Sequence, residues 1–190
     1  MVNTHPTVRP ENADYLKTKK AKLGHQLSLE PGDRLNGAIR FHHSDQPWGE
    51  LSNFSRHAVF QRGRIWPTVE HFYQAQKFVG TPHEEAIRRC QTPMLAKATA
   101  TDLTQEHCRE DWGSVKETVM IEGLRAKFEQ HPDLRERLLG SGDRRLVEHT
   151  RNDDYWGDGG SGTGKNRLGH LLMRVRTELR QRAQDDHHSI

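Results

Sequence analysis

Apolar residues between about residue 67 and residue 180 recur mainly at helical spacing, in short segments separated by glycine and proline. The longest segment runs from Ser114 to Glu129, and its apolar residues fall on one stripe of a helix. The few segments that alternate like strands do not follow these helices in a regular order, which argues against a doubly wound parallel sheet. The pattern therefore predicts an α+β fold that is predominantly helical, with a small antiparallel β element.

Other boundaries follow from local signals. We expect further helices to begin near Pro67, Pro82, Thr92 and Pro132, and a final amphipathic helix to carry Leu168 to Leu179. Short strands are expected at 38–42, 57–60, 64–66 and 145–149. The turn Gln61-Arg62-Gly63 would join the second and third of these strands into the antiparallel element.

The chain of 190 residues is long enough for one domain. Residues 1–36 are polar and carry a lysine-rich patch (17–22), so we expect a mobile N-terminal arm. The folded domain is expected to span residues 37–183, and residues 184–190 are expected to form a disordered tail.

Composition excludes some classes of function. The 29 basic residues barely exceed the 26 acidic ones, and the net charge of +3 lacks the dense basic face of a dedicated nucleic-acid binder. No stretch approaches the roughly 20 apolar residues of a membrane span. The first residues lack a secretory signal, and Cys90 and Cys108 do not form a CxxC pair. We expect a soluble, cytoplasmic protein with two reduced thiols and no membrane partner.

A glycine-rich segment, 157–166, contains the spacing G-x4-G-K. A Walker A phosphate loop is nevertheless rejected, because Asn166 stands where a serine or threonine should hold magnesium. The residues before the segment are not an apolar strand, and only 25 residues follow Lys165.

The same segment still has the chemistry of an anion site. Glycines such as Gly159 and Gly160 let backbone amides approach an anion closely, and a helix is expected to begin just beyond them. Lys165 and Arg167 add positive charge. The segment therefore favours a phosphate or diphosphate site, and the alternative is a flexible surface loop with a capped helix behind it.

The run from Trp66 to Phe78 is dense in aromatic and polar residues. On a helix, Glu70, Gln74 and Lys77 lie near one face, beside apolar neighbours. Such a face suits a pocket for a flat polar ligand, although it could equally carry surface ion pairs. Adjacent Glu and His side chains do not face the same way on a helix and no HExxH is present, so no metal site is expected.

Several long motifs in this order and spacing resemble the NADAR (YbiA-like) family over residues 38 to 180. These are GELSNF (49–54), WPTVEHFYQAQKF (66–78), DWGSVKETVM (111–120), LRAKFEQH (124–131) and LVEHTRNDDYWGDGGSGTGKNRLGHLLM (146–173). One departure is the pair His42-His43, where an aromatic or small polar residue would be expected.

The resemblance implies a single YbiA-like domain that hydrolyses N-glycosidic bonds without a cofactor. Family members related to YbiA act on phosphorylated ribosylaminopyrimidine intermediates of riboflavin biosynthesis, so the expected partner is a small ribosyl phosphate. Other members remove ADP-ribose from guanine in DNA or RNA, which would bring in a nucleic acid; the lysine-rich arm would then be either its contact or only a solubilising tail. A non-catalytic module that binds ADP-ribose or NAD is the remaining alternative.

The residues that the family marks as essential correspond to Glu70, Trp112, Asp153 and Trp156. A carboxylate near the anomeric carbon stabilises an oxocarbenium-like transition state and can activate water, and Glu70 is assigned that role. Asp153 would hold ribose hydroxyls or act as the acid, and the tryptophans would stack on the base, unless they serve only in packing. Further candidates for substrate contact are Asn53, Lys77, Lys116, Gly159, Gly160, Lys165, Asn166 and Arg167.

Overall fold

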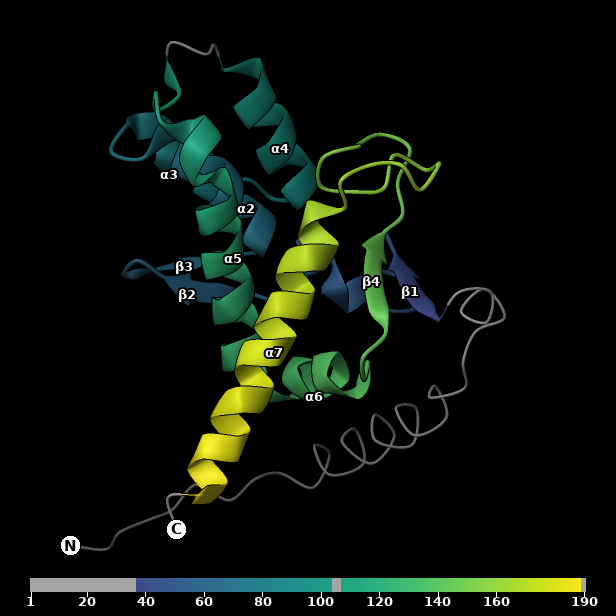
Figure 1. The fold of residues 1–190 in the computed structure, drawn as a ribbon. Coiled ribbons are helices and arrows are strands. Elements are labelled where there is room, and N and C mark those ends of the chain that lie inside the picture. The colour runs from purple at the N-terminus through teal and green to yellow at the C-terminus, as the bar shows by residue number, and fades with distance from the viewer. Residues whose placement is uncertain (1–36, 104–106, 189–190) are drawn as a thin grey trace, which may run out of the picture. The chain divides into compact units, whose positions relative to one another are not determined.

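Helices and short strands alternate irregularly in the computed structural model, which describes residues 37–103 and 107–188 (Figure 1). The helices are α2 (Val69–Ala75), α3 (Pro82–Arg88), α4 (Pro93–Asp102), α5 (Trp112–Gln130), α6 (Pro132–Gly140) and α7 (Arg167–His188), with 3-10 turns η2 (Gly49–Leu51) and η3 (Gln76–Phe78). The predominantly helical α+β class is thereby confirmed. The predicted arm (1–36) and residues 189–190 lie outside the described residues.

Threonine caps explain where three of the helices begin. The hydroxyl of Thr68 accepts a hydrogen bond from the amide of His71 at 3.2 Å, and Thr81 and Thr92 cap α3 and α4 in the same way. Each cap satisfies an amide that the first helical turn leaves without a partner. The helix starts were predicted near Pro67, Pro82 and Thr92, close to these caps, although Thr81 itself was not singled out.

Two boundaries differ from the prediction. Helix α5 begins at Trp112 rather than Ser114, because Ser114 does not cap the helix and its hydroxyl donates to the carbonyl of Asp111 at 2.8 Å. Helix α7 continues to His188, into the segment 184–190 that was expected to be a disordered tail.

The strands form two separate pairs. Strands β2 (Val59–Gln61) and β3 (Arg64–Trp66) are antiparallel, which confirms the predicted β element. Strands β1 (Ala38–Phe41) and β4 (Arg145–Glu148) pair in parallel, with Ile39 opposite Leu146. Both strands were predicted, but their pairing was not. The β1–β4 pairing joins the two ends of the domain, and Glu148 is the last residue of β4.

Helix α2 lies at the centre of the fold, in contact with α3, α4 and α5. All seven of its residues are buried, including Glu70, His71 and Gln74. Helix α5 approaches it closely, because a side chain at Gly123 would come within 2.9 Å of Val69. Polar side chains in such a position must find partners inside the protein or face a cavity.

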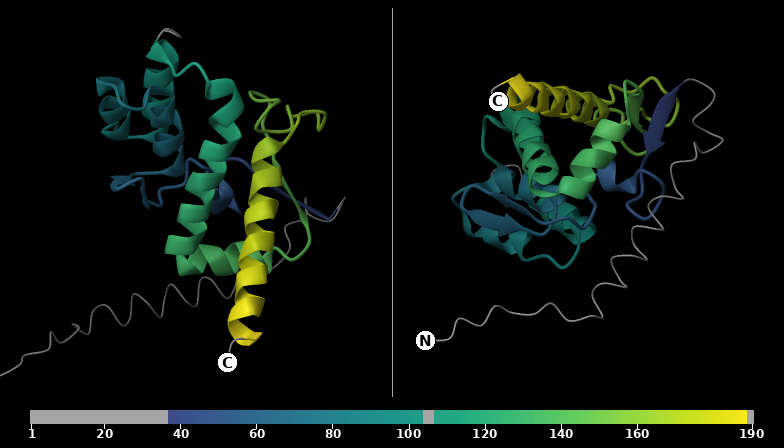
Figure 2. Two further views of the ribbon diagram at one scale, coloured as in Figure 1. Left: turned by 60° about the vertical axis from the view of Figure 1, so that its left-hand side comes forward. Right: turned by 90° about the horizontal axis from the view of Figure 1, so that it is seen from below.

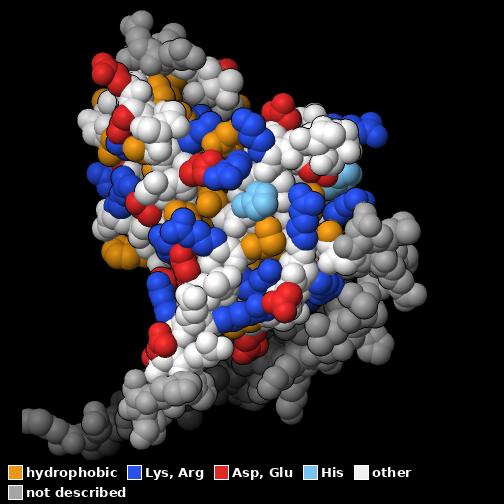
Figure 3. All heavy atoms as spheres, in the orientation of Figure 1, with side chains coloured by type: hydrophobic (Ala, Val, Ile, Leu, Met, Phe, Trp, Pro, Cys, Tyr) orange, Lys and Arg blue, Asp and Glu red, His pale blue; other side chains and the backbone are white. Residues whose placement is uncertain are grey.

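Helix α7 covers the other side of α5 and contacts β4, so that it lies between them in Figures 1 and 2. Ion pairs join α5 to α7, among them Arg125 with Glu178 at 2.7 Å. On the face drawn in Figure 3, basic and acidic side chains are correspondingly interspersed. No helix among the described residues is long and apolar enough to cross a membrane.

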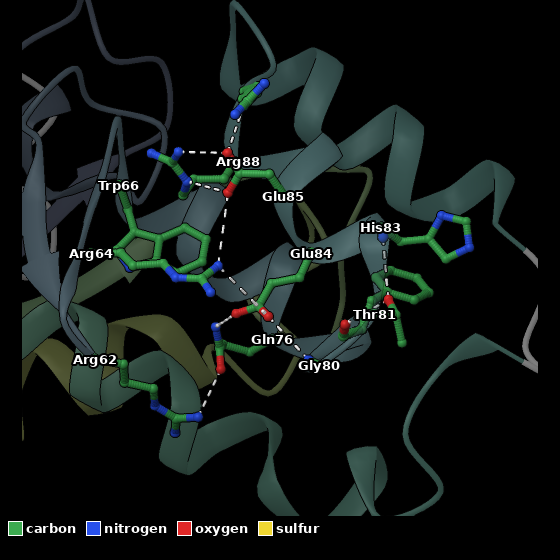
Figure 4. Close-up of polar contacts among 12 residues, drawn as sticks. Arg62, Arg64, Trp66, Gln76, Gly80, Thr81, His83, Glu84, Glu85 and Arg88 are labelled. Atoms are coloured by element: carbon green, nitrogen blue, oxygen red, sulfur yellow. Dashed lines mark hydrogen bonds and ion pairs between the residues drawn. The ribbon is translucent and has the colours of Figure 1, made fainter.

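Two polar networks fix the ends of the segment that carries Glu70. At its C-terminal end, Gln76 accepts a hydrogen bond from Arg62 at 2.7 Å, and Glu84 accepts one from the amide of Gly80 at 3.0 Å (Figure 4). These contacts tie the β2–β3 turn and α3 to the end of α2. Near its N-terminal end, the amide of Glu70 donates to the carbonyl of Asn53 at 3.0 Å.

Lys127 of α5 holds the segment that contains Asn53. Its side chain is completely buried, and its ammonium donates to the carbonyls of Glu50 (2.5 Å) and Ser52 (2.9 Å) and to the hydroxyl of Ser55 (2.6 Å). Burial lowers the pKa of Lys127 to about 7, against the attraction of Glu50. The three acceptors compensate for the loss of water around the ammonium.

Candidate active site

A cavity of about 200 Å³ opens beside α2. We call it the first chamber. Its lining combines carboxyl, amide and ammonium groups with aromatic and aliphatic surface, which is the composition of a site for a small polar ligand. The lining residues are Asn53, Phe54, Glu70, Tyr73, Gln74, Lys77, Lys97, Met120, Glu148, Asp153, Trp156 and Leu168.

Glu70 is only 2% exposed and presents its carboxylate to this chamber. Asn53 and Gln74 donate side-chain amide hydrogen bonds to its two oxygens, the latter at 2.7 Å. Burial raises the pKa of Glu70 to about 7, opposed by the Gln74 hydrogen bond and by the charges of Lys97 and Lys77. Near neutral pH this carboxyl can therefore gain or lose a proton readily.

Gln74 has an unused acceptor at the same place. Its side chain is 4% exposed, and its Oε1 is buried without a hydrogen-bond partner. A buried acceptor without a donor costs free energy, so a ligand hydroxyl or amide that reached it would be favoured. The side chain of His71, the neighbour of Glu70, is not part of the chamber lining. Its ring nitrogens form hydrogen bonds with the hydroxyl of Thr68 and the carbonyl of Cys90.

An aromatic wall bounds the chamber on the side of α5 and the 152–166 loop. The ring of Tyr73 lies between those of Trp112 and Trp156, with centroid distances of 5.0 and 5.4 Å. Trp156 lines the chamber, whereas Trp112 contacts it only through Tyr73 and Lys77. Of the two tryptophans, only Trp156 is thus placed to touch a ligand in this chamber.

Asp153 lies at the start of the glycine-rich loop and also lines the chamber. Its Oδ1 accepts hydrogen bonds from the amides of Tyr155 (2.9 Å) and Trp156 (2.7 Å). These bonds close a tight turn of the kind that aspartate favours. The turn fixes both the carboxylate and the Trp156 ring relative to α2.

The rest of the loop is bonded to itself. The amide of Gly159 donates to the carbonyl of Asp153 (3.2 Å), and that of Gly160 donates to the carboxylate of Asp158 (2.9 Å). Gly159 and Gly160 have φ values of 68° and 72°, which suit glycine. Their amides are therefore occupied inside the loop and are not directed at the chamber.

Asn166 also has a structural position. It is fully buried, its Oδ1 accepts from the amide of Glu148 at 3.0 Å, and its Nδ2 donates to the carbonyl of Leu146 at 2.9 Å. The side chain thus bonds the start of α7 to β4. It does not line the chamber.

Three predicted phosphate contacts lie outside the chamber, around Tyr155. The ammonium groups of Lys116 and Lys165 are 3.6 and 5.3 Å from the centre of its ring. Arg167 forms an ion pair with Glu117, which also accepts a hydrogen bond from the Tyr155 hydroxyl at 2.6 Å. These cations have partners in the protein, and none of them is among the lining residues of the chamber.

A larger cavity of about 370 Å³ adjoins the first, and we call it the second chamber. The two share Phe54, Lys97, Glu148 and Asp153, so these four residues form the wall between them. The second chamber is otherwise lined by His42, His43, Ser44, Ser52, Met94, Thr150 and Asn152. Among the described residues, no group of three or more His, Cys, Asp or Glu side chains could hold a metal ion.

Comparison with known proteins places this geometry in a family. A family model described as the NADAR domain matches residues 40–180. The chain belongs to the NADAR family. It is 50% identical over 141 residues to the N-glycosidase YbiA of Escherichia coli K12, across 74% of this chain and 88% of that protein. The NMR structure of E. coli YbiA matches with a TM-score of 0.72 and 46% identity, covering 79% of this chain and 89% of that one.

More distant relatives have related names. An N-glycosidase of Nostoc punctiforme is 43% identical over 145 residues, across 75% of this chain and 92% of that protein. A riboflavin biosynthesis protein of Vibrio vulnificus is 39% identical over 145 residues, across 76% of this chain but only 39% of that longer protein. The NADAR domain therefore also occurs as one part of larger proteins.

Of the residues singled out from the sequence, the structure brings Asn53, Glu70, Lys77, Asp153 and Trp156 together around the first chamber. Sequence reasoning missed Lys97 and Glu148. Glu148 lies inside one of the NADAR-like motifs and on a predicted strand, where no local pattern marks it as a site residue. Lys97 lies in none of the motifs, and only the packing of α4 against α2 brings it to the site.

Proposed function

We propose that this N-glycosidase of the NADAR family hydrolyses the bond between ribose and nitrogen in phosphorylated ribosylaminopyrimidine intermediates of riboflavin biosynthesis. The observation that carries the proposal is the buried carboxyl of Glu70, which faces a chamber lined by amide, ammonium and aromatic groups. The names of the E. coli and V. vulnificus relatives support the reaction type and the substrate class, respectively.

Glu70 has the properties that this reaction needs. Breaking the C–N bond builds positive charge on the sugar, and a carboxylate held in a water-poor site stabilises that charge strongly. The same group can accept a proton from the attacking water. With its pKa raised to about 7 by burial, Glu70 is a much better base near neutral pH than an exposed glutamate.

The other lining residues would hold the substrate around Glu70. One oxygen of Asp153 is held by two amides, and the other is free to accept a ribose hydroxyl. Gln74 Oε1 is a second acceptor for the sugar or the base. The Trp156 ring offers a surface for the pyrimidine, and Trp112 supports it through Tyr73.

Phosphate would be met by the two lysines of the first chamber, Lys77 and Lys97. An ammonium group binds phosphate as a point charge, and in a partly buried site this attraction is less screened by solvent. Lys116, Lys165 and Arg167 would contribute only if the phosphate extended toward Tyr155.

The test is to incubate the purified protein with a ribosylaminopyrimidine phosphate and to measure release of ribose phosphate. We expect turnover by the wild type and by Glu136→Gln, which makes the same chemical change on an exposed residue of α6. Glu70→Gln should fold and lose most turnover. Absence of release by the wild type would refute the proposed substrate.

A second candidate is the removal of ADP-ribose from guanine in DNA or RNA. It is favoured by one observation: a larger second chamber adjoins the first, which offers room for a bulkier leaving group or sugar substituent. The discriminating experiment offers the protein an oligonucleotide that carries ADP-ribosylated guanine. Release of ADP-ribose, without release of ribose phosphate from the pyrimidine substrate, would favour this candidate. Binding of ADP-ribose without cleavage of either substrate would favour a non-catalytic module.

A further inference from the structure

Glu148 is a third carboxyl group at the site, after Glu70 and Asp153. It is the last residue of β4 and lines both chambers. Its backbone is held on both sides, since its amide donates to Asn166 at 3.0 Å and its carbonyl accepts from the amide of Asp158 at 2.9 Å. The side chain therefore starts from a fixed point in the wall between the chambers.

The carboxyl of Glu148 differs from its neighbours in having no assigned partner. Within the described residues it takes part in no hydrogen bond or ion pair, whereas Glu70 accepts from Asn53 and Gln74. Asp153 is already an acceptor for two backbone amides. Of the two carboxyl groups in the shared wall, Glu148 is thus the one with both oxygens left for a ligand among the described residues.

We propose that Glu148 is the catalytic acid of this site and gives its proton to the nitrogen that leaves the ribose. The inference rests on the proposed N-glycosidase function, in which Glu70 takes a proton from water. It adds the group that gives a proton to the leaving nitrogen. Glu148 lines the first chamber together with Glu70 and Trp156, so its carboxyl shares the cavity in which the proposed function places the sugar and the base. Its proton would therefore lie within reach of the bond that breaks.

The charges around Glu148 favour its protonated form. Burial is the main cause that raises its pKa to about 8, and the carboxylates of Asp153, Glu70 and Asp158 add to the effect, while Lys97 opposes it. Burial also raises the pKa of Glu70, but the side-chain amides of Asn53 and Gln74 donate to both of its oxygens and favour its ionised form. Two carboxyl groups in such different surroundings can divide the roles of base and acid between them.

The step balances without a further reactant. The oxygen of a water molecule bonds to the anomeric carbon as the C–N bond breaks. The electron pair of the C–N bond moves to the nitrogen. The nitrogen takes the proton of Glu148, and Glu70 takes a proton from the attacking water. After the products leave, solvent returns a proton to Glu148 and removes one from Glu70, which restores the starting state.

The test compares the pH dependence of kcat and KM for wild type, Glu148→Gln and Asp154→Asn on a ribosylaminopyrimidine phosphate. We expect Glu148→Gln to lower kcat by at least about 100-fold, to change KM by less than about 3-fold, and to abolish the fall in rate above pH 8. Asp154→Asn removes an exposed carboxylate two residues before Trp156, outside both chambers, and should behave as wild type.

The failures are distinguishable. Wild-type turnover together with an unchanged rate and pH profile in Glu148→Gln would overturn the role of Glu148 alone. No turnover by wild type would refute the proposed function instead. A second measurement is independent of activity and of the folding of that variant: carbon NMR of labelled glutamate carboxyls, assigned with Glu148→Asp, should find a resonance that titrates near pH 8. Titration of Glu148 below pH 5 would overturn the proposal.

Discussion

Lys127 and Glu70 are both ionisable side chains with almost no exposed surface, 0% and 2%, and burial moves the pKa of each to about 7. Their surroundings differ. The Lys127 ammonium has three donors and meets three oxygens, so its hydrogen-bonding capacity is used completely. The Glu70 carboxylate accepts two hydrogen bonds and has a chamber beside it.

The comparison separates two uses of a buried charge. At Lys127 the ligands are all parts of the chain, and the result is a fixed segment, 49–55. At Glu70 the carboxylate can accept further hydrogen bonds from a bound ligand, and the nearby Gln74 Oε1 also has no hydrogen-bond partner. Burial and a shifted pKa occur at both places, so neither property alone marks an active site. The chamber is the distinguishing observation.

The strongest test of the comparison is Glu70→Gln. Removal of the ionisable group should lower kcat by about 1,000-fold, since general-base and electrostatic contributions are each worth factors of about 100 or more. The variant should remain folded by circular dichroism. Glu136→Gln serves as the matched control, and retention of more than a tenth of the wild-type kcat by Glu70→Gln would contradict the assignment.

Lys127→Met should show the opposite behaviour. It leaves the carbonyls of Glu50 and Ser52 without their donor, and we expect the free energy of unfolding to fall by about 3–5 kcal/mol. Urea denaturation measures the loss. The folded fraction should keep its kcat within about 10-fold, with a raised KM, because the segment that carries Asn53 becomes less fixed. A loss of kcat as large as that of Glu70→Gln would remove the distinction between the two residues.

The pH dependence of stability gives a third test. The folded pKa of Glu70, about 7, lies above its ordinary value of 4.5, so its favourable contribution is complete below pH 4.5 and is lost as pH rises through 7. Glu70→Gln should therefore be more stable than wild type at pH 8, by up to about 3 kcal/mol. The difference should vanish at pH 4. Equal thermal unfolding curves at both pH values would show that Glu70 is not perturbed by burial.

A smaller effect should separate the lysines of the chamber from those outside it. Lys77→Met should raise KM for the phosphorylated substrate by about 10-fold and for the dephosphorylated nucleoside much less, as expected for the loss of one charge contact worth about 1.4 kcal/mol. Lys165→Met should change either KM by less than about 3-fold, because its ammonium lies over Tyr155. A larger effect of Lys165→Met would place the phosphate near Tyr155 instead.

Local signals in the sequence were sufficient for much of the fold. Prolines and threonines at the helix starts located α2, α3 and α4, and the turn at Arg62 located the β2–β3 pair. The pairing of β1 with β4 could not be predicted, because it depends on contacts between the two ends of the domain. Neither could Lys127, since a lysine within an amphipathic helix normally faces solvent.

The site was predictable where one helix carries it and less so where loops meet. Helical spacing predicted that Glu70 and Lys77 share one face, and both line the first chamber, although Lys77 lies in the 3-10 turn η3 that follows α2. The glycine-rich loop was expected to direct its amides at an anion. In the structure, the acceptors of those amides are Asp153, Asp158 and neighbouring carbonyls of the same loop, and a sequence does not reveal which acceptors a flexible segment will find.

That self-bonded loop has a consequence for ligand affinity. A flexible loop whose amides bind an anion becomes ordered only on binding, and the conformational entropy that it loses weakens the binding. Here the turn at Asp153 and the side chain of Asn166 already hold the loop against β4. Association with this protein should therefore be close to rigid-body docking, with little of the interaction energy diverted into organising the wall that receives the ligand.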